Sequence, residues 1–232
     1  MSSHFYFEIE KLKKSILGLC TLVEESVKYS VTSVLELDYE LAGKVIVSDN
    51  EIDTVEVEIE EDCLKILALY QPVAKDLRFI VSVLKINNDL ERIADLSVNI
   101  AERTTSLESQ PPVELHDIFL SMSEKAVLML KKSIDSLIQR DTNLALSVLV
   151  ADDEVDSFYK DSFGLVNDLI HINPSLTGQL LHYSSIFRHL ERIADQTTNI
   201  AEDVIYMLKG GIIRHRKEFK NSHVNELNVS DD

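Results

Sequence analysis

The stretch LERIADLSVNIAE at residues 90–102 returns as LERIADQTTNIAE at residues 190–202, one hundred residues later. Ten of the thirteen positions are identical. Two shorter pairs precede it in the same order, each shifted by 103 residues: DNEID (49–53) with DDEVD (152–156), and DYELA (38–42) with DTNLA (141–145). Three matches in one order at nearly one offset indicate an internal duplication.

The boundary between the two copies is expected near SLESQPPVE, residues 106–114. This stretch is polar and carries adjacent prolines, which cannot continue a helix. We therefore expect a first half at 1–108 and a second half at 112–215. The polar end of the chain, 216–232, is expected to be disordered.

Each half is predicted to contain three long helices. The chain has 6 Gly, 4 Pro and no Trp, too few turn-forming residues for a strand-rich fold. Asp38 is a suitable N-cap for the second helix, and Pro72 separates the second helix from the third. The predicted class is all-α, with two tandem, duplicated three-helix bundles. The six helices are expected at about 6–37, 39–70, 73–103, 113–139, 142–172 and 176–209.

The charge balance excludes some partners. The chain has 40 acidic and 23 basic residues, a formal net charge of -17. Such a surface repels nucleic acid and anionic lipid and favours cations or basic partners. No stretch reaches the roughly 18 apolar residues of a membrane span. We therefore expect a cytoplasmic protein that binds no nucleic acid and does not insert into the membrane.

Acidic residues form stripes on the second and third helix of each half. Spacings of three and four residues place side chains above one another on one helix face. Like charges at these spacings destabilise a helix by a few tenths of a kcal/mol per pair, so something must offset the repulsion. The candidate ligands are Asp49, Asp53, Glu56, Glu60, Glu91, Asp95, Asn99 and Glu102 in the first half, and Asp152, Asp156, Glu191, Asp195, Asn199 and Glu202 in the second.

Two interpretations of the stripes remain open, a solvated acidic face and a metal site. Carboxylates and amide oxygens suit hard cations such as Mg²⁺, Ca²⁺, Mn²⁺ and iron. Aspartate is disfavoured inside helices, yet Asp95 and Asp195 stand there in both copies. The duplication favours metal. The second copy has Tyr159 and Phe163 where the first has glutamates, so it is expected to bind fewer metal ions or bind them more weakly.

Motifs for catalysis are absent from the sequence. There is no Glu-x-x-His pair of the di-iron bundles, no HExxH, no P-loop and no nucleophile elbow. We therefore expect a protein that is not an enzyme.

The two LERIAD…NIAE segments, each preceded by a helix with a DxxxD pattern, resemble the PhoU family. The segment LRFIVSVLKINNDLERIADLSVNIAE (77–102) is similar to the signature of that family, and the resemblance covers about residues 5–210. It implies a fold of two tandem three-helix bundles and a cytosolic regulator. The ligand motifs carried over by position are Asp49/Asp53, Glu91/Asp95, Asp152/Asp156 and Glu191/Asp195.

The resemblance also implies partners and cofactors. PhoU-like proteins restrain phosphate uptake and phosphate-starvation signalling, so the expected partners are the ATPase subunit of a phosphate ABC transporter and a sensor histidine kinase. Contact with these partners would place the protein at the inner membrane. Some family members carry surface metal clusters, which makes multinuclear iron the expected cofactor, with zinc, manganese, magnesium and calcium not excluded. The long exposed helices favour a homodimer.

Two further function classes stay open. One is a metal-storage or metal-dependent protein built in a helical bundle. The other is a helical scaffold whose acidic faces are only solvated. Metal titration separates the scaffold from the others, and association with a transporter ATPase subunit separates the regulator from metal storage.

Overall fold

The computed structural model describes residues 3–108, 113 and 115–211, and this part of the chain is helical without a strand. The predicted all-α class with six long helices is therefore confirmed. One short 3-10 turn, η1, was not anticipated; it lies before the last helix. The elements are α1 Ser3–Glu36, α2 Tyr39–Tyr70, α3 Ala74–Thr105, α4 His116–Gln139, α5 Thr142–Ile172, η1 Pro174–Leu176 and α6 Thr177–Lys209.

The helix ends follow from local chemistry that is repeated in both halves. The carboxylate of Asp38 accepts a hydrogen bond from the backbone N–H of Leu41 at 2.9 Å and caps α2. Asp141 caps α5 in the same way, and an aspartate is among the best N-cap residues. Helix α6 ends at Gly210, whose φ of 76° is a left-handed conformation that glycine adopts without strain.

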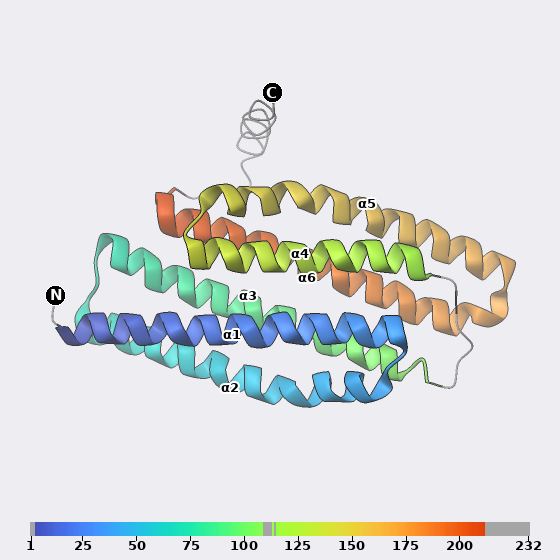
Figure 1. The fold of residues 1–232 in the computed structure, drawn as a ribbon, viewed down its shortest axis with the longest axis horizontal. Helices are drawn as coiled ribbons and strands as arrows, with labels where there is room; N and C mark the ends of the chain where they lie inside the picture. Colours follow the sequence, from blue (N-terminus) through green and yellow to red (C-terminus); the bar gives the residue numbers. More distant parts are fainter. Residues whose placement is uncertain (1–2, 109–112, 114, 212–232) are drawn as a thin grey trace, which may run out of the picture.

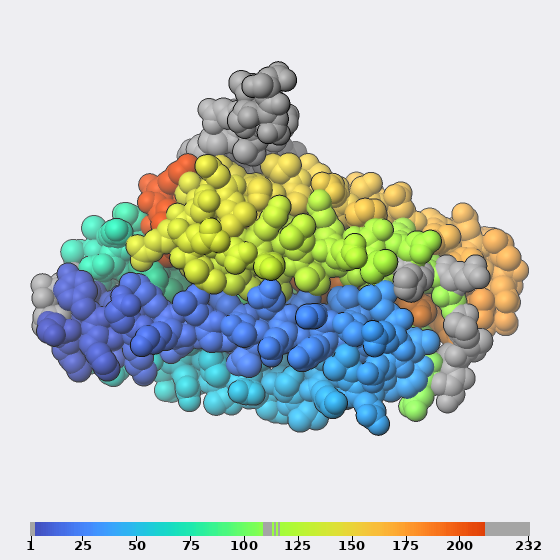
Figure 2. All heavy atoms as spheres, in the orientation of Figure 1, coloured from blue at the N-terminus to red at the C-terminus, as the bar shows by residue number. Residues whose placement is uncertain are grey.

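The helices form two bundles that lie side by side (Figure 1). Helices α1–α3 make one bundle and α4–α6 the other, and the bundles meet where α3 packs along α6 and α1 packs along α4. Helices α2 and α5 lie at the two outer edges. Figure 2 shows α1 and α4 as adjacent rows on one face of the molecule.

One continuous hydrophobic core joins the two halves. It includes fully buried side chains from both copies of the repeated segment, such as Ile93 and Ile193. Phe119 of α4 and Phe187 of α6 are also buried, with ring centroids 6.1 Å apart in an edge-to-face arrangement. The bundles are thus tandem in sequence but share a core in space.

Some expectations fall outside the described residues. The Pro111–Pro112 seam and the tail at 216–232 belong to the undescribed parts, so the boundaries at 1–108 and 112–215 stay predictions. Within the described helices, none combines the length and the apolar character that a membrane-crossing segment needs.

Candidate metal centre

The first acidic cluster comprises Asp49, Asp53 and Glu56 of α2 with Glu91 and Asp95 of α3. These helices pack against each other, and carboxylates of α2 lie close enough to those of α3 for their charges to act on one another. Burial raises the pKa of Glu91, and the nearby charges of Asp95, Glu56 and Asp53 raise it further. The pKa of Asp95 is raised by burial and by Asp53 in the same way. The tertiary structure therefore brings together carboxylates that stand about forty residues apart in the sequence.

Asp49 is the most perturbed member of the first acidic cluster. Burial, together with the charges of Asp53 and Asp95, raises its pKa to about 6. Its Oδ1 atom is buried and has no hydrogen-bond partner. A buried carboxylate oxygen without a partner is costly, and a bound cation would satisfy it.

Asn87 positions Glu56 and was not identified from the sequence. Its side-chain amide is buried on α3 and donates to the main-chain oxygen of Glu56 at 2.9 Å and to its Oε1 at 3.0 Å. These two bonds hold the glutamate side chain beside α3, as an outer-shell partner holds a ligand. The signal available in the sequence was an asparagine on the apolar face of the third helix, three residues before Leu90.

The remaining predicted ligands of the first half lie around this cluster. Glu60 is exposed one turn after Glu56, and its charge contributes to the raised pKa of Glu56. The Asn99 amide donates to the main-chain oxygen of Asp95 at 2.6 Å, which fixes the side chain one turn along α3. Glu102 is exposed about 10 Å farther along the helix axis than Asp95. Glu102 therefore lies at the margin of the first acidic cluster and not at its centre.

The second acidic cluster comprises Asp152 and Asp156 of α5 with Glu191 and Asp195 of α6. Burial raises the pKa of Glu191, followed by the charges of Asp195 and Asp156, while Arg188 lowers it. The pKa of Asp195 is likewise raised by burial and by Asp156, and lowered by Arg192. Asn199 and Glu202 are half-buried farther along α6.

The two clusters differ where Glu56 meets Asn87. The corresponding positions of the second half hold Tyr159 and Phe187, so the second copy has lost both members of that hydrogen-bonded pair. Phe187 is fully buried, and Phe163, at the position of Glu60, is 66% exposed. The second cluster therefore offers fewer oxygen ligands, and weaker metal binding there stays a prediction.

The donor chemistry of the first acidic cluster fits a cation. It supplies only hard oxygen ligands, and one of them, Asp49 Oδ1, is buried without a hydrogen-bond partner. Among the described residues, no three His, Cys, Asp or Glu side chains stand in a ready-made metal geometry. Metal binding would thus require these partly exposed carboxylates to change rotamer, a small adjustment for side chains at the surface.

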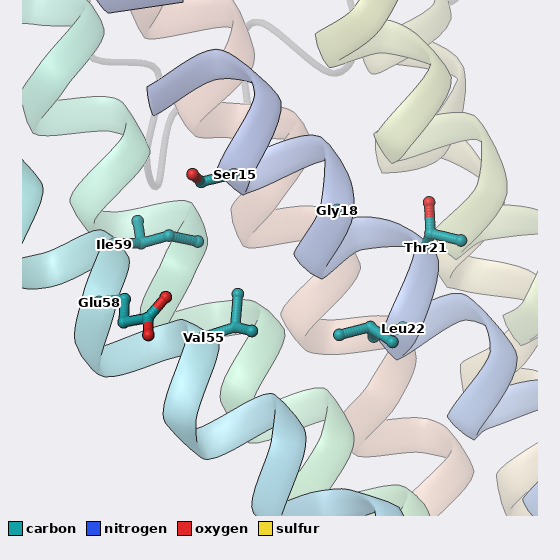
Figure 3. Close-up of a pocket in the computed structure, with 7 residues that line it drawn as sticks. All are labelled: Ser15, Gly18, Thr21, Leu22, Val55, Glu58 and Ile59. Carbon is teal, nitrogen blue, oxygen red and sulfur yellow. The ribbon is translucent and has the colours of Figure 1, made fainter. Parts of the chain in front are cut away.

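The described residues also form a surface groove. A groove of about 530 Å³ runs between α1 and α2 (Figure 3). It is lined mainly by small and apolar side chains, and Glu58 is its one ionisable lining residue. The groove therefore lacks a cluster of chemically active groups, and the acidic clusters remain the candidate functional sites.

The family model described as "PhoU domain" matches residues 16–104 and again residues 119–204. The two matches together cover most of the chain and fall on the two halves of the duplication.

The chain belongs to the PhoU family.

Relatives in this family match nearly end to end. A "Phosphate-specific transport system accessory protein PhoU homolog" of Aquifex aeolicus is 38% identical over 90% of this chain and 95% of its own length. A protein of the same description from Pseudomonas putida is 36% identical, covering 93% of this chain and 84% of its own. The crystal structure of PhoU from Pseudomonas aeruginosa has a TM-score of 0.87 at 34% identity, covering 89% of this chain and 100% of that one. The PhoU fold is therefore shared.

In this PhoU-family chain, the raised pKa of Asp49 predicts a pH-dependent stability in the absence of metal. In the unfolded chain the Asp49 carboxyl releases its proton near its ordinary pKa of 3.8, whereas in the folded chain it keeps the proton to a higher pH. The resulting stabilisation is complete below that value and is lost as the pH rises through about 6. In chelator, we expect the melting temperature, followed by circular dichroism, to fall from about pH 4 to about pH 6 and to level off above that range.

The control for this prediction compares two charge-neutral variants. Asp49→Asn should flatten the fall, because the group that titrates is gone. Glu61→Gln, at an exposed position on the same helix, should leave the fall unchanged. An equal slope in wild type and Asp49→Asn would show that Asp49 is not the titrating group.

Proposed function

We propose that this chain is a cytosolic regulatory accessory protein of a phosphate-specific transport system. The observation that supports the proposal is the near end-to-end match to relatives that bear this description, with both halves matched. In this role the protein restrains phosphate uptake and the phosphate-starvation response when phosphate is plentiful. It acts by binding, not as an enzyme.

The proposed partners are the ATPase subunit of a phosphate ABC transporter and a sensor histidine kinase. An adaptor needs long surfaces that are available at the same time, and two side-by-side bundles with outer helices α2 and α5 supply them. Its contact with the transporter would place the protein at the membrane surface through its partners. A homodimer would present each surface twice.

Metal bound at the acidic clusters is part of the proposal. The ligands would be Asp49, Asp53, Glu91 and Asp95 in the first cluster, and fewer groups in the second. Multinuclear iron suits adjacent carboxylate pairs, while zinc, manganese, magnesium and calcium remain open because oxygen ligands discriminate weakly among hard cations. A bound cation would turn a repulsive acidic patch into one that accepts an acidic surface of a partner or a phosphate group.

A gene deletion in the source organism tests the regulatory role. At high phosphate, the deletion should raise phosphate uptake and switch on phosphate-starvation genes, because the restraint is lost. Reintroducing the wild-type chain should restore both. Uptake and gene expression that do not change after deletion would contradict the proposal.

Affinity purification tests the adaptor role separately. The tagged chain should retain the transporter ATPase subunit when it is purified from its own cells. The variant with Asp49→Asn and Asp95→Asn distinguishes the part played by metal, since both changes keep side-chain size. If neither protein retains the ATPase subunit or the kinase, the adaptor role is wrong even where the deletion phenotype stands.

A further inference from the structure

A two-lobed pocket lies where both halves contribute helix ends. It is formed by the N-terminal parts of α1 and α3 and the C-terminal ends of α4 and α6, which gather at one end of the molecule (Figure 1). The lobes measure about 100 and 70 Å³. They share the lining residues Lys13, Phe79, Arg140 and Met207, so the two lobes adjoin each other.

The larger lobe is apolar. Besides the shared residues, it is lined by Ile16 and Leu17 of α1 and by Leu137 and Ile138 of α4. Its 100 Å³ is less than the roughly 150 Å³ of a closed cavity that holds benzene. Because this lobe opens to the surface, a single ring or a short alkyl chain can enter it partway.

The smaller lobe is rich in cations. It adds Lys75 and Asp76 of the first turn of α3 to Lys13 and Arg140. Within the described part of the chain, the side chains of Lys75 and Arg140 form no ion pair with any carboxylate. Three cations thus face one lining carboxylate. The uncapped N-terminus of α3, at Val73, adds partial positive charge.

Lys13 links the two lobes. Its ammonium lies 5.9 Å from the centre of the Phe79 ring, in reach of a cation–π contact, and it pairs with Glu10 at 2.5 Å. The pKa of Glu10 is lowered by Lys13, and also by Lys14 and Arg140. In a chain of net charge -17 whose acidic clusters have raised pKa values, this corner is locally positive.

The duplication provides an internal comparison. The position of Arg140 in the first half is Leu37, and both residues end a helix in the left-handed conformation, with φ of 55° and 51°. Because Leu37 ends its helix in the same conformation, the helix end does not require the charge of Arg140. Lys75 corresponds to Ser175, and Lys13 to His116. The set of cations occurs at only one end of a repeated scaffold, so the repeated fold alone does not explain it.

We infer that this pocket binds a small organic anion, with the anionic group between Lys13, Lys75 and Arg140 and a short apolar group beside Phe79 and Leu17. The ligand class is a phosphomonoester or carboxylate joined to one ring or a short alkyl chain. Charge-assisted hydrogen bonds to Lys and Arg hold the head, and burial of the apolar group adds affinity. Neither metal nor the acidic clusters take part.

Calorimetric titration of the full chain with phenyl phosphate tests the inference. Chelator is present so that metal-bound phosphate does not contribute. We expect saturable binding at one site per chain, at least tenfold tighter than inorganic phosphate or phenol alone. Arg140→Gln and Lys75→Gln should each weaken binding about tenfold, since each removes a charged hydrogen-bond donor. Asp76→Asn should strengthen it, because it removes the opposing charge.

The matched control is Lys131→Gln, an exposed cation on the helix that ends at Arg140. It should leave binding unchanged, and unaltered melting temperatures would show that all variants fold. No binding of phenyl phosphate at millimolar concentration would overturn the inference. So would equal binding in wild type and Arg140→Gln, or inorganic phosphate binding as tightly as phenyl phosphate.

Discussion

Replacing Asp49 and Asp95 by asparagine should abolish the metal binding proposed for the first acidic cluster, together with most of the thermal stabilisation expected from it. The two carboxylates come from different helices, and the charge of Asp95 helps to raise the pKa of Asp49. A bound cation would offset that repulsion and satisfy the unpaired Asp49 Oδ1. At metal concentrations a hundred times the Kd, binding stabilises the folded chain by about 2.7 kcal/mol. For a chain of this length that is a rise in Tm of roughly 5 to 10 °C.

The second half of the chain provides the matched control. Asp152→Asn with Asp195→Asn makes the same chemical change in the cluster that lacks the counterparts of Glu56 and Glu60. Elemental analysis of untagged protein, purified without chelator, should show the larger metal loss in the first-half variant. Thermal melts with added iron, manganese or zinc should show the same order.

The outcomes separate the open interpretations. If both variants retain as much metal as the wild type, the metal binds away from the acidic clusters. If wild type carries no metal and takes none up on titration, the stripes are solvated faces or partner contacts, and the metal part of the proposed function is wrong. If the second-half variant loses more metal than the first-half variant, the second acidic cluster is the stronger metal site, contrary to the prediction.

Phe187→Ala should lower the free energy of unfolding by about 3 to 5 kcal/mol, the usual cost of removing a buried ring. Phe187 is fully buried in α6 and meets Phe119 of α4 edge to face. The change removes that aromatic contact and leaves a cavity in the core that joins the two halves. Urea unfolding followed by circular dichroism measures the loss.

Phe163→Ala is the matched control, because it deletes the same ring from a position that is 66% exposed. Its effect should stay within about 0.5 kcal/mol. A loss of the same size in both variants would mean that Phe187 is not in a tightly packed core. Two separate unfolding transitions in wild type would contradict the single core.

The sequence determined much of the helical framework because the signals for it are local. Prolines, the N-cap aspartates Asp38 and Asp141, and apolar periodicity act within one or two turns. The expected helix at 142–172 matches α5, and the expected helix after Asp38 matches α2. The turn η1 was missed because the residues before 176 were expected to form only a break between helices, and a 3-10 turn of three residues fits inside that break.

The candidate metal centre was predictable only in part. Helical spacing placed each acidic stripe on one face, so Asp49 with Asp53 and Glu91 with Asp95 followed from the sequence. That the two stripes meet depends on how α2 packs against α3. The contact of Asn87 with Glu56 depends on the same packing, which spacing along one helix does not specify.

By itself, the sequence determined the duplication, the six helices and the identity of the acidic groups on each helix, because these depend on neighbours along the chain. Only the tertiary structure decided that α3 and α6 pack together in one core, which carboxylate loses its hydrogen-bond partners, and that Lys13, Lys75 and Arg140 share one pocket. These features depend on side chains far apart in the chain. The burial of apolar surface between the helices brings them together.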